Sequence, residues 1–244
     1  MILHIPHASK EIPAALRSQI LLSDAALSSE LVVMTDGYTD KLFTCPGATR
    51  IVFPISRLIV DPERFLDNHD EPMSRVGMGV IYTRTSDGGK LRRDVTAGER
   101  KRLIKSYYGP HHDRLLRSLD VELTSRDHAL IVDCHSFPRQ PLPCDRDQSV
   151  PRPDFCVGTD SFHTPDGLKR GIMQAIRMEG FSVEENRPFA GTIVPAGYYK
   201  TDQRVWSVMI EVCRDLYMDE KSGSMTENFF RIHLAVEGIL KGLQ

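Results

Sequence analysis

Residues 130–138 read LIVDCHSFP, an apolar run that continues directly into an aspartate, a histidine and a serine before a proline. Because side chains alternate along a β-strand, Asp133 and His135 are expected on one face and the apolar side chains on the other. In open α/β sheets, ligands bind beyond the carboxyl ends of the strands. This polar pair therefore indicates a candidate site. The alternative is that His135 is an ordinary loop histidine and that Asp133 caps the turn before the proline.

Strand-like and helix-like segments alternate along the chain. Strands are expected at residues 1–5, 50–54, 80–84, 129–134, 155–158, 181–184 and 205–212, and helices at 14–21, 24–43, 165–179 and 224–243. TAGE at residues 96–99 has the form of a capping box, and the apolar spacing after it predicts a long helix kinked at Gly109 and Pro110. The alternation predicts an α/β fold, with residues 1–244 forming one domain around a mixed sheet flanked by helices.

The composition is that of an ordinary globular protein. The 244 residues suffice for a sizeable core, and the formal net charge is −2 with 26% charged residues. The basic stretch at 90–105 is interpreted as the solvated start of a helix, with phosphate contact as the alternative. No basic stripe with interleaved aromatic residues indicates a nucleic-acid partner. The breaker-rich segment 138–154 is expected to be an active-site loop.

Cysteine usage and the first residues bear on the compartment. Five widely spaced cysteines without a C-x-x-C pair argue against a disulfide framework. The opening MILHIPHAS lacks the charged and apolar regions of a signal peptide, and no stretch approaches the length of a membrane span. We therefore expect a reducing, cytoplasmic environment and no membrane partner.

Three more ionisable residues stand at or inside apolar runs. His7 follows the first strand, Asp36 opens the segment DGYTDKLF, and Glu211 lies inside SVMIEVC. Two histidines and one carboxylate that leave a position open form a recurring catalytic zinc site, so His7, Asp36 and His135 are candidate metal ligands. The competing interpretations are a helix N-cap for Asp36 and an ion pair with Arg214 for Glu211, although the latter two would face opposite sides of a strand.

Several segments, in order, resemble motifs of the N-formylglutamate amidohydrolase family. They are PHAS (family P-H-S-G), TDGYTDKLF (its aspartate-bearing helix), SRLIVDPERF (S-R-x-x-x-D-x-N-R), YYGPHHDRL (Y-x-x-P-Y-H-x-x-L), VDCHS (D-x-H-S), NRPFAG (N-x-P-F-x-G) and IEVCRDLY (E-x-R-x-x-L-Y). The matches run from residue 4 to about residue 217. The chain departs from the family at Glu63, where the family has asparagine, and in PHAS, which alters the turn beyond His7.

That family is similar to the zinc carboxypeptidases, and the resemblance implies their mixed α/β sheet, a phosphorylase/hydrolase-like fold. It also implies a zinc ion, or another divalent metal, bound by His135. The carboxypeptidases carry H-x-x-E at the first ligand site, whereas Lys10 stands at that spacing here, so Asp36 is taken as the third ligand beside His7. Asp133, or a backbone group, is expected to orient the other ring nitrogen of His135.

The implied activity is zinc-dependent hydrolysis of the amide of an N-formyl or N-acyl amino acid such as N-formylglutamate, giving the amino acid and formate, a reaction of histidine degradation. Glu211 is expected to be the general base and His112 the donor to the oxyanion, with His111 as the alternative donor. Guanidinium groups suit substrate carboxylates, with structural ion pairs as the alternative role. The candidates are Arg57, Arg64 and Arg214.

Two other functions stay open. One is hydrolysis of another N-acyl amino acid or a small peptide, because the added charge of Glu63 would disfavour an acidic substrate side chain if it faced the pocket. The other is a non-catalytic α/β protein that binds an acidic metabolite. Each of these functions has a small molecule as the partner, and the sequence leaves the oligomeric state open.

Overall fold

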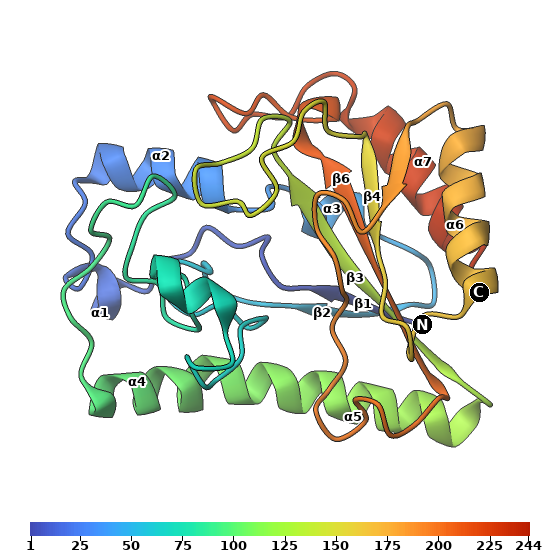
Figure 1. The fold of residues 1–244 in the computed structure, drawn as a ribbon, viewed down its shortest axis with the longest axis horizontal. Helices are drawn as coiled ribbons and strands as arrows, with labels where there is room; N and C mark the ends of the chain where they lie inside the picture. Colours follow the sequence, from blue (N-terminus) through green and yellow to red (C-terminus); the bar gives the residue numbers. More distant parts are fainter.

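The computed structural model describes residues 1–244, and at its centre lies a twisted sheet of six strands (Figure 1). The strands are β1 (Ile2–Ile5), β2 (Thr49–Val52), β3 (Ala129–Phe137), β4 (Phe155–Gly158), β5 (Val183–Glu185) and β6 (Val205–Cys213). Their order is β2-β1-β3-β6-β4-β5, and every neighbouring pair is parallel except the antiparallel pair β4–β6. The predicted mixed α/β sheet flanked by helices is confirmed.

Helices pack on both faces of this sheet. The α-helices of the chain are α1 (Ala14–Arg17), α2 (Asp24–Met34), α3 (Thr39–Leu42), α4 (Ala97–Leu103), α5 (Gly109–Ser125), α6 (Asp166–Met178) and α7 (Phe229–Lys241). Apolar residues of one sheet face pack with α3, α6 and α7, and the other face packs with α5 near the amino ends of the strands. None of the helices is both long and apolar enough to cross a membrane.

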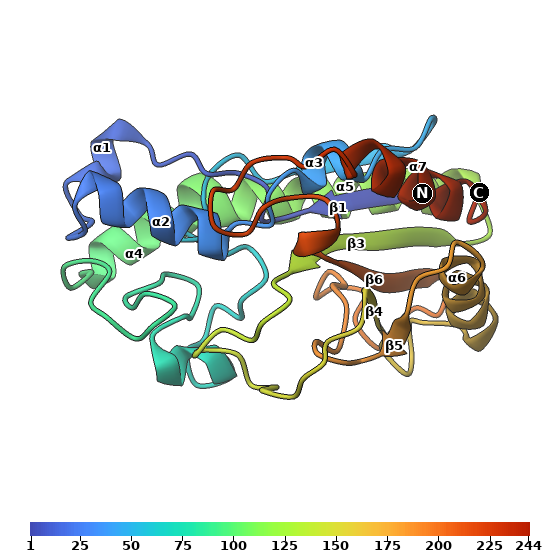
Figure 2. The same cartoon turned by 90° about the horizontal axis from the view of Figure 1, so that it is seen from above.

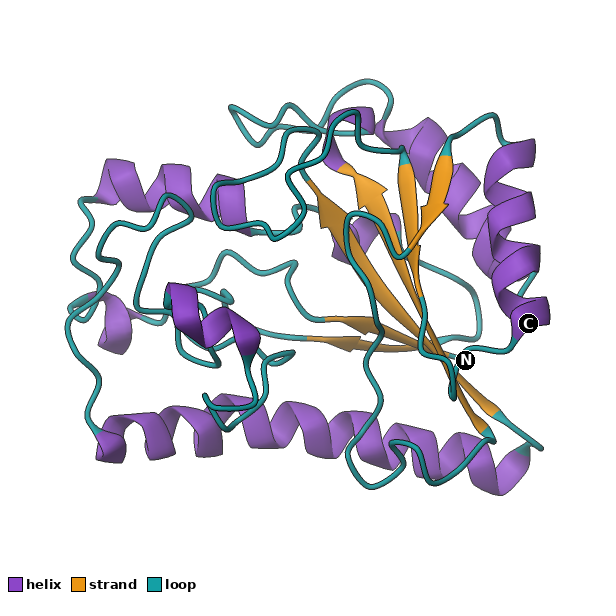
Figure 3. Ribbon diagram, viewed as in Figure 1, coloured by secondary structure: helices purple, strands orange, loops and turns teal.

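A loop-rich half lies beside the sheet. It contains α1, α2, a 3₁₀ turn η1 (Pro72–Val76) and the long connection that follows β2 (Figures 1 and 2). Figure 3 shows how little regular structure this connection has. Its residues share a separate buried apolar cluster with α2 and α4. The loop-rich half therefore has its own core, and its loops can be held against the polar end of the sheet.

Two predicted elements differ in extent from the expectation. β3 continues to Phe137, so His135 lies inside the strand and not beyond it. The predicted helix at 24–43 is two helices, α2 and α3, because the chain turns at residues 35–38, where Tyr38 has a left-handed φ of 65°. This turn gives Asp36 a place between two helices that a continuous helix would not provide.

Three further expectations differ from the structure. The predicted strand at 80–84 forms only two isolated antiparallel bridges, Met78 with Tyr82 and Arg84 with Lys90. Both bridges lie within one glycine-containing segment, residues 77–90, so the segment pairs with itself and not with the sheet. The last helix begins at Phe229 and not at residue 224, and β5 covers Val183–Glu185.

The capping box that begins the long helix is confirmed. The Thr96 hydroxyl accepts from the backbone N–H of Glu99, and the Glu99 carboxylate accepts from the backbone N–H of Thr96. A π-helical turn, η2 (Ile104–Tyr108), joins α4 to α5. Pro110 has no N–H and its ring would clash with the carbonyl of Ser106 in a regular helix, so the wider turn accommodates it.

Candidate functional site

His7 and His135 meet at the carboxyl ends of two neighbouring strands. His135 lies on β3 and His7 follows β1, which pairs with β3 in parallel. Both side chains are buried, and their ring centroids are 5.1 Å apart. The structure thus brings together the two histidines that the sequence singled out.

Two carboxylates contact both histidines. Glu63 Oε2 lies 3.1 Å from His135 Nε2 and 3.7 Å from His7 Nδ1. Asp36 Oδ2 lies 3.0 Å from His135 Nδ1 and 3.6 Å from His7 Nδ1. One ligand atom from each of His7, Glu63 and His135 lies within 4.8 Å of the other two, a spacing suited to one metal ion. Sequence reasoning named Asp36 and missed Glu63, although it noted the departure from the family asparagine.

The two carboxylates differ in their other partners. Asp36 Oδ1 accepts from Arg214 Nη2 at 2.8 Å, and its Oδ2 also accepts from the backbone N–H of Ser136. The Glu63 carboxylate has no lysine, arginine or backbone N–H within hydrogen-bond distance, and its only polar contacts are with histidines. The charge of Asp36 is therefore balanced by the protein, whereas that of Glu63 is not.

A third carboxylate holds His7 from the other side. Asp61 Oδ1 accepts from His7 Nε2 at 2.9 Å. Its Oδ2 accepts from the Tyr82 hydroxyl at 2.7 Å and from Arg57 Nη2 at 2.9 Å. Burial alone raises the pKa of Asp61, but the positive charges of His7, Arg57 and Arg64 outweigh it and hold the pKa well below its usual range. Asp61 is thus an ionised anchor for His7, and sequence reasoning missed it.

Asp133 contacts two histidines on the same sheet face. Its Oδ1 lies 2.8 Å from His4 Nδ1 and 3.1 Å from His135 Nε2, while its Oδ2 accepts from the backbone N–H of Ile193. His4 Nε2 lies 2.8 Å from His111 Nε2 of α5, and burial lowers the pKa of His111 to about 2, so that ring is neutral. His4, another missed residue, was hidden inside the apolar run MILHI.

The environment of His135 favours positive charge. Burial lowers the pKa of His135, but the negative charges of Glu63 and Asp133 outweigh it and raise the pKa well above its usual value. A proton on the ring and a metal cation therefore compete for the same place, because ligation requires neutral imidazole. The excess of carboxylates is the electrostatic property expected of a cation site.

Glu211 lies on β6 directly opposite His135 on β3, so the two side chains project from the same sheet face. It is 6% exposed, forms no ion pair, and its Oε2 lacks a hydrogen-bond partner. Burial raises the pKa of Glu211 to about 8. The alternative pairing with Arg214 is absent, because Arg214 binds Asp36 instead.

The three predicted arginines fall into two groups. Arg214 is buried and donates to Asp36, to the Val33 carbonyl and to Ser136. Arg57 and Arg64 remain 13% and 22% exposed, and both approach Asp61. Arg57 Nη1 makes no hydrogen bond, and it lies 3.9 Å from Asp36 Oδ1.

His112, the predicted oxyanion donor, contacts the backbone. Its Nε2 lies 2.7 Å from the Pro62 carbonyl oxygen, which can only accept, so this nitrogen carries the proton and donates it there. The ring stacks on Tyr108 with centroids 4.1 Å apart. His111 is directed to His4.

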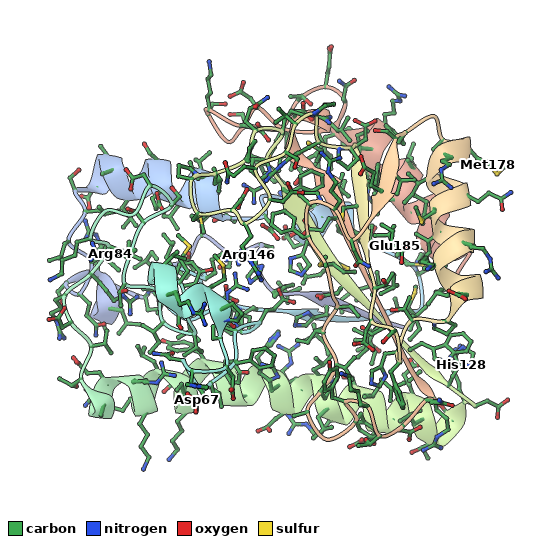
Figure 4. The ribbon with its side chains drawn as sticks, in the orientation of Figure 1. Asp67, Arg84, His128, Arg146, Met178 and Glu185 are labelled. Atoms are coloured by element: carbon green, nitrogen blue, oxygen red, sulfur yellow. The ribbon has the colours of Figure 1, made fainter.

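The segment 138–154, expected to be an active-site loop, bridges the two halves. Arg152 binds the Asp145 carboxylate and the Pro138 carbonyl, and Leu142 and Cys144 pack against the apolar cluster of the loop-rich half. Figure 4 shows Arg146 of this segment between the loop-rich half and the sheet. A separate polar hollow of about 750 Å³, lined by Lys169, Glu185 and Trp206 among others, contains none of the site residues.

Comparisons with known proteins bear on the family and the fold. A model of the N-formylglutamate amidohydrolase family matches residues 1–218. The fold is similar to that of N-formylglutamate amidohydrolase from Ralstonia eutropha JMP134, with a TM-score of 0.88 and 23% identity over 99% of this chain and 91% of that one. It is also similar to a gene product of Agrobacterium tumefaciens, with a TM-score of 0.65 and 18% identity over 99% and 90% of the two chains. Among curated protein sequences there is no match.

Proposed function

The chain belongs to the N-formylglutamate amidohydrolase family, and from this premise we propose that it hydrolyses the amide bond of an N-formyl or related N-acyl amino acid with one bound divalent metal ion, zinc being the first candidate. The products are the free amino acid and formate or another carboxylic acid. The observation that carries the proposal is the meeting of His7, Glu63 and His135 at one point of the sheet edge.

The donor set suits zinc. Two imidazoles and one carboxylate are a common catalytic zinc set that leaves a position open. His7 Nδ1 is buried without a hydrogen-bond partner, and the polar contacts of the Glu63 carboxylate are all with histidines. When bound, such an ion supplies Lewis-acid chemistry, lowering the pKa of water and polarising the carbonyl.

Hydrogen bonds support a definite choice of ring nitrogens. Asp61 accepts a hydrogen bond from His7 Nε2–H, which puts the ring lone pair of His7 on Nδ1, and Asp36 accepts from His135 Nδ1–H, which puts the lone pair of His135 on Nε2. These two lone-pair nitrogens are the ones that approach Glu63, and His135 Nε2 also lies 3.1 Å from Asp133 Oδ1. The contacts thus favour Glu63 as the third ligand. Asp36, the ligand predicted from the sequence, then orients His135.

A second group, His4, Glu63 and Asp133, also has suitable spacing. It shares Glu63 with the first group, and both nitrogens of His4 already have partners in Asp133 and His111. The first group, which has a free nitrogen, is therefore the better position for a single ion.

Glu211 is the proposed general base. It is placed beside His135, has an oxygen without a partner, and its pKa is about 8 because of burial. A base whose pKa lies near neutrality can take a proton from water and return it to the leaving amine. Positive charge beside the Glu211 carboxylate lowers its pKa and so favours the ionised form, which this step needs.

Arg57 and Arg64 are the proposed substrate contacts. Both side chains remain partly exposed, whereas Arg214 is buried and engaged with Asp36 and backbone groups. A guanidinium fork binds both oxygens of the amino acid carboxylate. The free Nη1 donors of Arg57 also suit the oxyanion that forms during hydrolysis, a role that His112 is less able to fill because its Nε2–H is given to Pro62.

A formate-release assay tests the function. Chelator-treated protein should lose turnover of N-formyl-L-glutamate and regain it with added zinc, cobalt or manganese. A panel of N-formyl and N-acetyl amino acids with acidic, neutral and basic side chains should then rank the substrates. Absence of turnover across the panel, in protein that binds one equivalent of zinc, would favour a binding protein over an enzyme.

The panel also tests the second candidate, an amidohydrolase for a non-acidic amino acid. If Glu63 is not a metal ligand and its carboxylate faces the substrate, it repels an acidic substrate side chain. Preference for neutral or basic side chains would then be expected in place of N-formylglutamate.

A further inference from the structure

Glu63 lies at the beginning of an exposed stretch of chain. Residues 65–70 are all exposed, and Asp67, labelled in Figure 4, marks this stretch beside the long helix. The Glu63 side chain itself is 15% exposed, and its polar contacts are with His4, His7 and His135. These contacts involve the carboxylate, so other groups must hold the backbone that directs it toward His7 and His135.

The helix α5 and its π turn contact the backbone on both sides of Glu63. His112 Nε2 donates to the Pro62 carbonyl at 2.7 Å, and the Tyr108 hydroxyl donates to the Arg64 carbonyl at 3.2 Å. The backbone N–H of Glu63 donates to Asp61 Oδ1 at 3.0 Å, the oxygen that also binds His7. Three hydrogen bonds thus fix the peptide units around Glu63.

Helical spacing explains why these two side chains point the same way, and the π turn sets the direction of the face that carries them. Tyr108 and His112 are four residues apart and their rings stack, with centroids 4.1 Å apart. One extra residue in the turn rotates the following helix by about 100° relative to an uninterrupted α-helix. Without it, the face that carries Tyr108, His111 and His112 would not meet the Glu63 segment and His4 as it does.

We propose that Tyr108 and His112 are positioning residues that clamp residues 62–64 against α5 and so aim the Glu63 carboxylate at the metal position. The clamp rests on the proposed metal site, but its action on the backbone does not require the ion. It assigns to the family-like histidine of this helix a task in building the site and not in contacting the substrate.

Zinc affinity, measured by competition with a chromophoric chelator, tests the clamp. His112→Ala should weaken zinc binding by about 10- to 100-fold, the usual effect of losing a group that orients a ligand. Tyr108→Phe, which keeps the ring stack and removes one hydrogen bond, should weaken it by roughly 2- to 10-fold. His69→Ala is the matched control, because His69 is 93% exposed on the same loop and contacts no site residue.

Two further variants separate positioning from a general structural effect. His112→Gln places an amide N–H at the same number of bonds from Cβ as Nε2, so it should recover much of the affinity. In a Glu63→Gln background, His112→Ala should cause almost no additional loss, because the residue it acts through is already absent. Additive losses, or no recovery in His112→Gln, would overturn the clamp.

Hydrogen exchange on metal-free protein makes the result independent of the proposed function. His112→Ala should speed exchange of the peptide covering residues 62–66 and leave β3 unchanged. Unchanged exchange in that peptide would overturn the clamp even if zinc binds as proposed. If the wild type bound no zinc, the proposed function would fail, while exchange would still decide whether α5 holds the segment.

Discussion

Replacing Glu63 by glutamine removes a carboxylate that contacts both His7 and His135 and has no arginine or lysine partner. Its partners are histidines only, so the change leaves no arginine or lysine unpaired. For a partly exposed residue of this kind we expect a stability change within about 0.5 kcal/mol, or a melting temperature within about 2 °C of the wild type. Zinc affinity should fall by more than roughly 100-fold, beyond the usual effect of an orienting group, because a ligand is lost.

Replacing Asp36 by asparagine should have the opposite profile. The substitution removes the charge partner of Arg214, which is buried. An unpaired buried charge costs about 3–5 kcal/mol, and the lower end applies because Arg214 keeps its hydrogen bonds to Val33 and Ser136. At about 2–4 °C per kcal/mol for a chain of this size, the melting temperature should fall by roughly 6–12 °C. Zinc affinity should fall only about 10- to 100-fold, because His135 loses its orienting partner but remains a ligand.

Thermal melts of metal-free protein and chelator competition for zinc measure the two effects separately. Glu185→Gln is the charge-matched control, since Glu185 lies on β5 and pairs with Lys169 at the surface, and neither quantity should change appreciably. If Asp36→Asn abolished zinc binding while Glu63→Gln stayed within tenfold of the wild type, the assignment of Glu63 would be refuted. Asp36 would then be the third ligand, as the sequence predicted.

Three other substitutions have expected outcomes. Glu211→Gln should lower kcat by about 10²- to 10⁴-fold while zinc content stays at the wild-type level, and turnover near wild type would remove the proposed base. Gly158→Ala would place a Cβ 2.3 Å from the Gly191 carbonyl oxygen and 2.4 Å from Met209 Cε, so a loss of about 1–3 kcal/mol is expected in denaturant unfolding. Burial raises the pKa of Glu30, which accepts from the N–H and hydroxyl of Ser86. Because the folded-state pKa lies above the unfolded one, the stabilisation from protonated Glu30 is complete below the unfolded pKa of about 4.3 and is lost as pH rises through the folded pKa. Melting temperatures of Glu30→Gln relative to wild type should therefore rise from pH 4 to pH 8, and a flat difference would contradict this.

Much of the fold followed from local patterns. The alternation in residues 130–138 correctly placed Asp133 and His135 on one face, because side chains alternate along a strand whatever it pairs with. The break of the helix predicted at 24–43 did not follow in the same way. It depends on a left-handed Tyr38, on hydrogen bonds from Tyr38 to Gly223 and from Tyr217 to Gly37, and these partners are far away in the sequence.

The site was predictable where a residue ends a strand and less so where a loop contributes it. His7, His135 and Glu211 were named because each interrupts an apolar run, which is costly without a reason. Glu63 lies in a polar segment of the loop-rich half, where a glutamate is unremarkable, and its direction depends on contacts with α5. The departure from the family asparagine was the one available signal, but a sequence does not tell which way a loop side chain points.

The division between sheet and loop also bears on how the site is assembled. His7 and His135 are brought together by the parallel pairing of β1 with β3, so their spacing is as rigid as the sheet. The backbone around Glu63 is held at the same point by the hydrogen bonds of Asp61, Tyr108 and His112. An ion bound by all three proposed ligands would join the loop-rich half to the sheet, since each half contributes part of the ligand set. Metal affinity in this protein should therefore depend on how well α5 holds the loop, because the pairing of the strands already fixes the histidines.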